Sequence, residues 1–173
     1  MSDTRWLDDD EQHTWRSFLT ANRLLFDGIE RQLQQGAGLP HAYYEILVRL
    51  SEAPGRTLRM SELATTSLSS RSRISHAVAR LEESGWVRRR PCADDKRGQL
   101  AELTDTGLAG LQAAAPGHVD AVRRGLFDAL SPEQVAALRD ISDALVAHLS
   151  TRPVWPATAT DAATDASDGG CST

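Results

Sequence analysis

Residues 60–90 constrain the fold of this chain more than any other stretch. They begin with a short helical segment over 60–66, opened by Ser61. A serine-rich turn follows, in which the hydroxyl of Ser69 or Ser70 can accept a backbone hydrogen bond and cap a second helix. That helix should end at Gly85, because glycine adopts the left-handed conformation just past a helix end at little cost. Two short helices joined by a tight turn are typical of a DNA-reading unit.

The second helix of this pair has two distinct faces. Ile74, Val78 and Leu81 form one apolar stripe at helical spacing, which should face the body of the domain. The other face carries hydroxyls and long cations that suit base edges and phosphates in the major groove. A solvated helix can also present such a face, so the helix alone leaves both interpretations open. The candidate DNA-binding residues are Ser70, Arg71, Ser72, Arg73, Ser75, His76 and Arg80.

A β-hairpin is predicted directly after this helix. Residues 86–90 and 99–104 have strand character, and a polar turn containing Asp and Gly joins them. A hairpin in this place is a wing, and its tip carries Lys96 and Arg97, which suit a phosphate or the narrow minor groove of A/T-rich DNA. We expect Asp95 to orient the guanidinium of Arg97, because a carboxylate near a phosphate is repelled.

These motifs, in this order, resemble the MarR (multiple antibiotic resistance regulator) family, whose wing reads D-x-R-G and ends in L-T-x-x-G. The resemblance covers roughly residues 8 to 150. It implies a dimeric winged helix-turn-helix regulator, mainly α with a small β-hairpin wing. Another bacterial family of winged-helix regulators is the alternative. The matching segments are Asp95-Lys96-Arg97-Gly98, Leu103-Thr104, Thr106-Gly107, Met60 to Ala64, and residues 72–87.

Charge is unevenly distributed along the chain. The 173 residues carry a net charge of −5, which by itself argues against a nucleic-acid binder. Between Arg56 and Arg97, however, there are ten basic and five acidic residues, a local charge of +5, so the remainder carries −10. This segregation gives the DNA-reading segment its own positive field.

Helical patterns flank this segment on both sides. Apolar residues at helical spacing predict a long helix over 8–35 and another helix after Pro40. A further helix should start at Thr104 and kink or break near Pro116, because proline removes a backbone hydrogen bond and crowds the preceding turn. The last helix should start at Ser131, which is followed by proline and, three residues on, by glutamine.

We therefore predict a winged helix-turn-helix domain over 40–104 and a helical dimerisation region over 8–35 and 105–150. The flanking helices have more apolar surface than the winged domain can cover, so we expect a two-fold homodimer, with a self-packed monomer as the alternative. A dimer would place its recognition helices about one DNA turn, roughly 34 Å, apart on a palindromic operator. The composition of residues 153–173 predicts a disordered tail.

Cellular location and catalysis are constrained mainly by absent motifs. An acidic run near the N-terminus precedes any apolar segment, which argues against a secretory signal, and no stretch is long enough to span a bilayer. The two cysteines are distant in the sequence, which favours a reducing compartment. We therefore expect the protein in the cytoplasm. Ser75 and His76 are neighbours on a helix, so their side chains diverge by about 100° and cannot form a nucleophile and its base. The histidines lack metal-binding spacing. We expect no enzyme activity, no cofactor and no metal.

The family resemblance also places a ligand crevice between the dimer helices and the winged domain. Trp15, Arg16, His41 and Tyr44 are candidates to line it, and this mixture would suit an anionic aromatic ligand. Trp15 also falls on the apolar stripe of its helix, where a core position is the simpler interpretation. The predicted function is a transcriptional regulator, a repressor that occludes a promoter and leaves the DNA when a small molecule binds.

Two alternative functions stay open. A redox-responsive regulator could use Cys92, whose thiol pKa the neighbouring residues 88–90, all arginines, could lower. The family's redox sensors, however, typically place the cysteine near the start of the dimer region, where this chain has none. An interaction protein of the same fold could have lost DNA binding, although the arginines of the helix and the wing argue against it.

Overall fold

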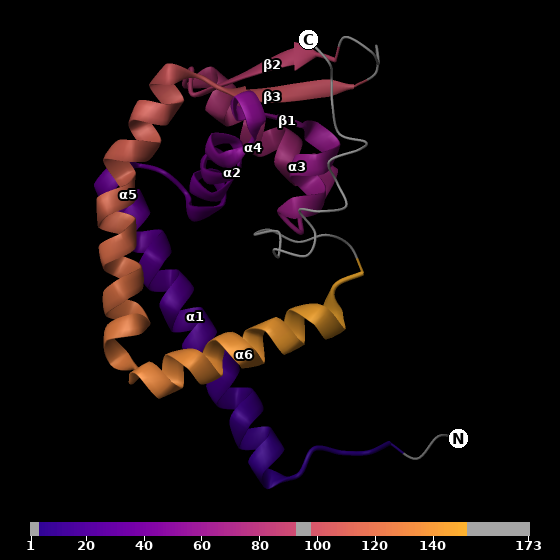
Figure 1. Cartoon of the computed structure of the whole chain (residues 1–173), viewed down its shortest axis with the longest axis vertical. Coiled ribbons are helices and arrows are strands. Elements are labelled where there is room, and N and C mark those ends of the chain that lie inside the picture. Colours follow the sequence, from indigo (N-terminus) through magenta and orange to yellow (C-terminus); the bar gives the residue numbers. More distant parts are fainter. Residues whose placement is uncertain (1–3, 93–97, 152–173) are drawn as a thin grey trace.

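The computed structural model describes residues 4–92 and 98–151, and it confirms a mainly helical fold with a small antiparallel sheet. Helices α1 and α5 lie side by side, α2 to α4 and the sheet form a second group, and α6 extends away from the end of α5 (Figure 1). The elements are α1 (Asp9–Ala37), α2 (His41–Glu52), the short turn η1 (Pro54–Arg56), β1 (Thr57–Arg59), α3 (Met60–Thr66), α4 (Arg71–Glu83), β2 (Val87–Pro91), β3 (Gln99–Leu103), α5 (Asp105–Gly125), the short turn η2 (Phe127–Ala129) and α6 (Pro132–Leu149).

Local caps set the ends of the long first helix. Asp8 accepts a hydrogen bond from the backbone N–H of Glu11 at 2.8 Å, and the Glu11 carboxylate accepts one from the Asp8 N–H at 3.0 Å. This reciprocal pair satisfies two N–H groups at the start of the helix. The last helical residue is Ala37, two residues beyond the predicted end at residue 35, and Gly38 follows as the cap with a φ of 62°.

The predicted helix pair is confirmed as α3 and α4. Ser70 caps α4 by accepting a hydrogen bond from the Arg73 N–H at 3.3 Å, and Gly85 follows the helix with a φ of 74°. The apolar stripe of α4 is buried as expected. One detail differs, because α3 begins after Arg59 with no side-chain cap, and Ser61 lies within its first turn.

The sheet has three strands in the order β1-β3-β2, and both pairs are antiparallel. The predicted hairpin corresponds to β2 and β3, in which Val87 pairs with Leu103 and Pro91 with Gln99. β1 was not predicted, because three residues are too few to show alternation; its residues pair with positions 100–102 of β3. The wing tip, with Asp95, Lys96 and Arg97, lies outside the described residues, as does the predicted tail over 153–173.

We expected Pro116 to kink or break its helix; the break is wrong, because α5 is continuous from Asp105 to Gly125. Proline removes one backbone hydrogen bond, and packing of α5 along α1 supports the helix on either side of it. Figure 1 shows α5 bending along its length rather than stopping. The helix ends at Gly125, and Phe127 lies in the following turn η2.

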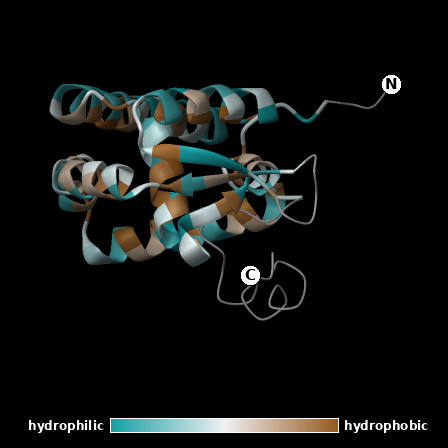
Figure 2. Ribbon diagram, turned by 90° about the horizontal axis from the view of Figure 1, so that it is seen from above, coloured by the Kyte–Doolittle hydropathy of each residue, from teal (hydrophilic) through white to brown (hydrophobic). Residues whose placement is uncertain are grey.

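The hydrophobic core lies where the helices and the sheet meet, as the brown positions in Figure 2 show. It packs against the buried face of α4, on the side of the helix opposite its exposed face. The largest fully buried side chains in it come from α1, α2, α3, α4 and β2: Leu33, Ile46, Leu47, Leu50, Leu63, Val78, Leu81 and Val87.

A second set of apolar side chains has no cover within the described part of the chain. No residue of α6 is buried, and the first half of α1 is also exposed. No helix in residues 4–92 or 98–151 has the length and apolarity needed to cross a membrane. The exposed apolar residues of these two helices are Trp15, Phe18, Leu19, Leu24, Phe26, Ile141, Leu145, Val146 and Leu149.

Candidate nucleic-acid interface

The exposed face of α4 carries every helix residue that we predicted to meet DNA. Ser70 is exposed at the cap, and its oxygen accepts the hydrogen bond that starts the helix. Core residues behind this face hold the helix in place while the polar side chains point outward. The other exposed members are Arg71, Ser72, Arg73, Ser75, His76 and Arg80.

The arginines of α4 differ in their partners. Arg80 forms an ion pair with Glu83 at 2.8 Å, and this hydrogen bond raises the pKa of Arg80 above its ordinary value. Within residues 4–92 and 98–151, Arg71 and Arg73 make no ion pair. Among the described residues of α4, the positive charge available to a ligand is therefore concentrated at the N-terminal end of the helix.

The arginines of β2 bind carboxylates of the protein itself. Arg88 and Arg90 both contact Glu102 of β3, at 2.7 and 2.6 Å. Arg89 contacts Glu82 of α4, and its backbone N–H and its side chain together hold the pKa of that carboxyl below its ordinary value. These pairs reduce the positive field that the sequence charge suggested, and the Arg89–Glu82 pair joins the wing to α4.

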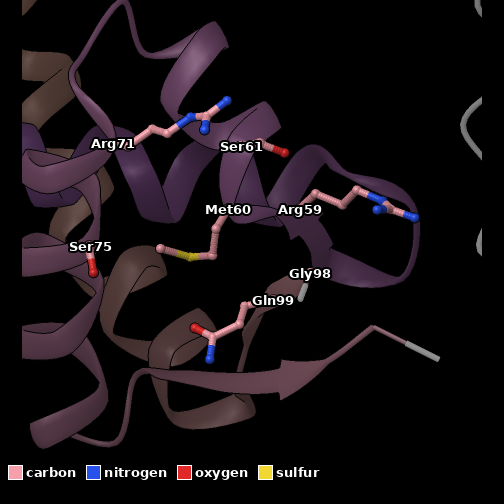
Figure 3. A pocket seen from close by; sticks show the side chains of 7 residues that line it. All are labelled: Arg59, Met60, Ser61, Arg71, Ser75, Gly98 and Gln99. Atoms are coloured by element: carbon pink, nitrogen blue, oxygen red, sulfur yellow. The ribbon is translucent and has the colours of Figure 1, made fainter. Parts of the chain in front are cut away.

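A hollow of about 430 Å³ separates the first turns of α4 from the base of the wing. Figure 3 shows Met60 and Gln99 extending into the space between α3, α4 and β3. Within residues 4–92 and 98–151, the lining combines hydrogen-bond donors with one thioether and includes no carboxylate. Its residues are Arg59, Met60, Ser61, Arg71, Ser75, Gly98 and Gln99.

The four predicted ligand residues fall into two groups. His41 and Tyr44 of α2 lie with His118 of α5, whose ring centroid is 5.9 Å from that of His41 and 4.4 Å from that of Tyr44. Phe26 of α1 is 5.7 Å from His41. Burial, and secondarily the charge of His41, lowers the pKa of His118. This first group joins the winged domain to α1 and α5.

The second group lies at the start of α1. Trp15 and Arg16 line a separate hollow of about 480 Å³ together with Trp6, Leu7 and Gln12. Trp15 is 52% exposed, so the interpretation as a core residue is wrong for the protomer. The Arg16 guanidinium donates a hydrogen bond to the Gln12 side chain at 3.1 Å.

Sequence reasoning missed several residues of these surfaces. His118 is far from His41 in sequence, and no local spacing could join them. Ser61 and Gln99 looked like ordinary exposed positions until the fold placed them beside Arg71. The alternation of Arg88 and Arg90 on one face of a strand was an available signal for a shared carboxylate partner across the hairpin.

Comparison with known proteins gives the family. A MarR family profile matches residues 37–98. The transcriptional repressor YetL of Bacillus subtilis is 33% identical over 113 residues, which cover 64% of this chain and 68% of the repressor. The crystal structure of Sco3205, a MarR family transcriptional regulator from Streptomyces coelicolor in complex with DNA, is 53% identical, covers 87% of this chain and 94% of that one, and has a TM-score of 0.83.

A second Streptomyces coelicolor structure, the MarR family transcriptional regulator AbsC, is 46% identical with a TM-score of 0.80 and covers 84% of this chain and 98% of that one. The likeness to both structures includes the winged domain and most of the flanking helices. Sequence, fold and the basic end of α4 agree, and this chain belongs to the MarR family of transcriptional regulators.

Proposed function

We propose that this protein is a homodimeric repressor that binds a palindromic operator and leaves it when a small ligand binds. The observation that carries DNA binding is the exposed N-terminal end of α4, where Arg71 and Arg73 are not occupied by acidic partners among the described residues. Arginines in this place suit guanine edges and phosphates. Related regulators include one bound to DNA and one named as a repressor.

The exposed apolar surface supports the dimer. The α6 helix buries no residue in the protomer, and an amphipathic helix gains its stability mainly from packing. A second copy would cover α6 and the first half of α1. We therefore assign residues 8–35 and 105–150 to dimerisation and residues 40–104 to DNA binding, with Lys96 and Arg97 at the wing tip and Asp95 orienting Arg97.

The joint between α1, α2 and α5 supports ligand control. His41 and Tyr44 lie there with His118, so a ligand inserted among these rings would move the winged domain relative to the dimer helices. An imidazole pair with a phenol suits an anionic aromatic molecule. Trp15 and Arg16 would take part only through the separate hollow at the start of α1.

Two alternatives receive less support from the geometry. Cys92 is only 3% exposed, and the three arginines preceding it in β2 pair with Glu82 and Glu102, so neither its accessibility nor these arginines favour a reactive thiol. An oxidant that changes DNA affinity in a Cys171→Ser background would favour the redox alternative. An interaction protein without DNA binding would not need exposed arginines on α4.

Fluorescence anisotropy tests the proposal directly. The purified protein would be titrated against the promoter duplex adjacent to its own gene, and against a duplex selected with this protein from a random library. Tight binding that resists unrelated competitor DNA and weakens steeply with salt is expected. Binding to the selected duplex no tighter than to random DNA would contradict the proposal.

A further inference from the structure

If α4 enters the major groove and the wing enters the neighbouring minor groove, the hollow beside α4 lies at the boundary between the two grooves. Adjacent grooves of a duplex are separated by one sugar–phosphate strand. That strand must then pass between the first turns of α4 and the base of the wing. The hollow lined by Ser61, Arg71, Ser75 and Gln99 lies in this interval (Figure 3).

The side chains of the hollow match the chemistry of that strand. A phosphodiester carries only hydrogen-bond acceptors, and phosphates are bound by arginine, hydroxyl and amide side chains together. Arg71 supplies a guanidinium, Ser61 and Ser75 supply hydroxyls, and Gln99 supplies an amide, from three separate elements. Among the described residues, no carboxylate lines the hollow, so none of the side chains placed there repels an anion.

The shape fits a sugar as well as a phosphate. The partly buried Met60 provides an apolar surface between the polar side chains, and its flexible thioether can pack against a deoxyribose ring. A volume of about 430 Å³ is large enough for one nucleotide backbone unit.

Resting on the proposed DNA-binding function, we infer that this hollow holds the strand between the two grooves and that Gln99 and Ser61 donate hydrogen bonds to its phosphates. These contacts set the register of α4 on the duplex and read no base. Their loss lowers affinity for every sequence by a similar factor.

Substitutions of charged and neutral residues that line the hollow should affect the salt dependence of DNA affinity differently. Binding a phosphate with Arg71 releases a condensed counterion, so Arg71→Ala should reduce the slope of log affinity against log salt by about one. An amide releases none, so Gln99→Ala should leave the slope unchanged while lowering affinity about 3- to 10-fold.

Gln99 is a clean probe of the hollow. Its side chain is exposed, and it takes part in the sheet through the backbone pairing of β3 with β2 at Pro91. Substitutions there leave the core intact. Gln112 is an exposed glutamine on α5 outside the hollow, so Gln112→Glu changes the net charge by the same amount as Gln99→Glu.

The experiment compares wild type, Gln99→Ala, Gln99→Glu and Gln112→Glu on the selected duplex. In a parallel series, one phosphate at a time is replaced by a neutral methylphosphonate. Gln99→Glu should weaken binding at least about 10-fold, because a carboxylate would face a phosphate, whereas Gln112→Glu should change it less than about 2-fold. At one phosphate position, neutralisation should remove the difference between wild type and Gln99→Glu.

The outcomes separate the two levels of the proposal. If wild type shows no preference for the selected duplex, the repressor function itself fails and this inference fails with it. If wild type binds specifically but Gln99→Glu matches Gln112→Glu, only the phosphate role of the hollow is overturned. A deficit of Gln99→Glu that persists at every neutralised phosphate also overturns it.

Discussion

Glu82 of α4 accepts two hydrogen bonds from Arg89 of β2, one from its backbone N–H at 3.0 Å and one from Nε at 2.7 Å. The Glu82 carboxylate thus binds both the main chain and the side chain of Arg89 in β2, the first strand of the wing. The angle between α4 and the wing therefore depends on this pair. In the proposed DNA complex both elements would have to reach their grooves together, so this pair would position the proposed DNA-binding surface without lying on its exposed face.

Replacing Glu82 by glutamine should destabilise the protein in a pH-dependent way. The Arg89 contacts lower the pKa of Glu82 in the folded state, so their contribution is present above the ordinary value of 4.5 and is lost as pH falls through the depressed folded pKa. At pH 7 we expect a loss of about 1 kcal/mol, because the partly exposed pair is screened by solvent. Thermal unfolding of wild type and Glu82→Gln at pH 7 and at about pH 3 measures this loss of stability, with the exposed Glu62→Gln as control. A difference from wild type that does not shrink in acid would contradict the assignment.

Gly107→Ala should be strongly destabilising, because a Cβ there would lie 2.1 Å from the carbonyl oxygen of Trp86. The clash is with the backbone, so α5 would have to move away from Trp86, which should lower the free energy of unfolding by about 1–3 kcal/mol or more. The matched control is Gly28→Ala, whose Cβ meets nothing closer than 4.0 Å and should stabilise α1 by about 0.5–1 kcal/mol. Urea unfolding of both variants checks the prediction, and equal effects would refute the close approach.

His118 should make stability fall in mild acid. Burial and His41 lower its folded pKa below the ordinary value of 6.5, so the unfolded chain binds the proton more readily. Stability is therefore full above about pH 6.5 and declines as pH falls towards the depressed folded value. His118→Gln should flatten the dependence of Tm on pH between about 7.5 and 5.5, whereas exposed His13→Gln should not. An unchanged pH profile in His118→Gln would show that other groups are responsible.

Leu145→Glu should separate the proposed dimer into monomers. Leu145 is 43% exposed on α6, and a carboxylate in an apolar interface would lose its hydration. Sedimentation velocity should show half the mass of wild type, and operator affinity should fall because two linked half-sites are no longer engaged together. Glu133→Gln at the exposed start of α6 is a control that should stay dimeric. A monomeric wild type would contradict the dimer.

Arg73→Ala should lower operator affinity and relax base preference at its contact, at a cost of about 1–3 kcal/mol. Arg97→Ala at the wing should instead weaken binding evenly across sequences and reduce the salt slope by about one. Competition against single-base operator variants distinguishes the two patterns. Either residue loses its assigned role if its variant binds like wild type.

The sequence predicted the parts of this fold that short-range interactions determine. Ser70 caps α4 and Gly85 ends it within residues that are neighbours in the chain, so their chemistry is visible in the sequence. Pro116 shows where such rules fail. Its local effect predicts an interruption, but tertiary packing against α1 maintains the helix through it.

The interactions that were missed all join distant segments. Glu102 contacts both Arg88 and Arg90 only because β3 turns back beside β2. His118 meets Tyr44 only because α5 passes α2 on its way along α1. The predicted roles of the α4 residues remain predictions, although their exposure agrees with them. The hollow at Gln99 could not be predicted, because three elements must be in place before it exists.

Continuous α5 also has a mechanical consequence. The Thr104 hydroxyl, at the start of α5, donates a hydrogen bond at 2.7 Å to the carbonyl of Gly85, which lies between α4 and β2. The 21 residues of α5 make a helix about 31 Å long. Such a helix acts as a lever arm nearly as long as one turn of DNA. A tilt of about 10° at one end would displace the other by about 5 Å, so in the proposed dimer a small rearrangement beside His118 would be enough to change the distance between the two α4 helices.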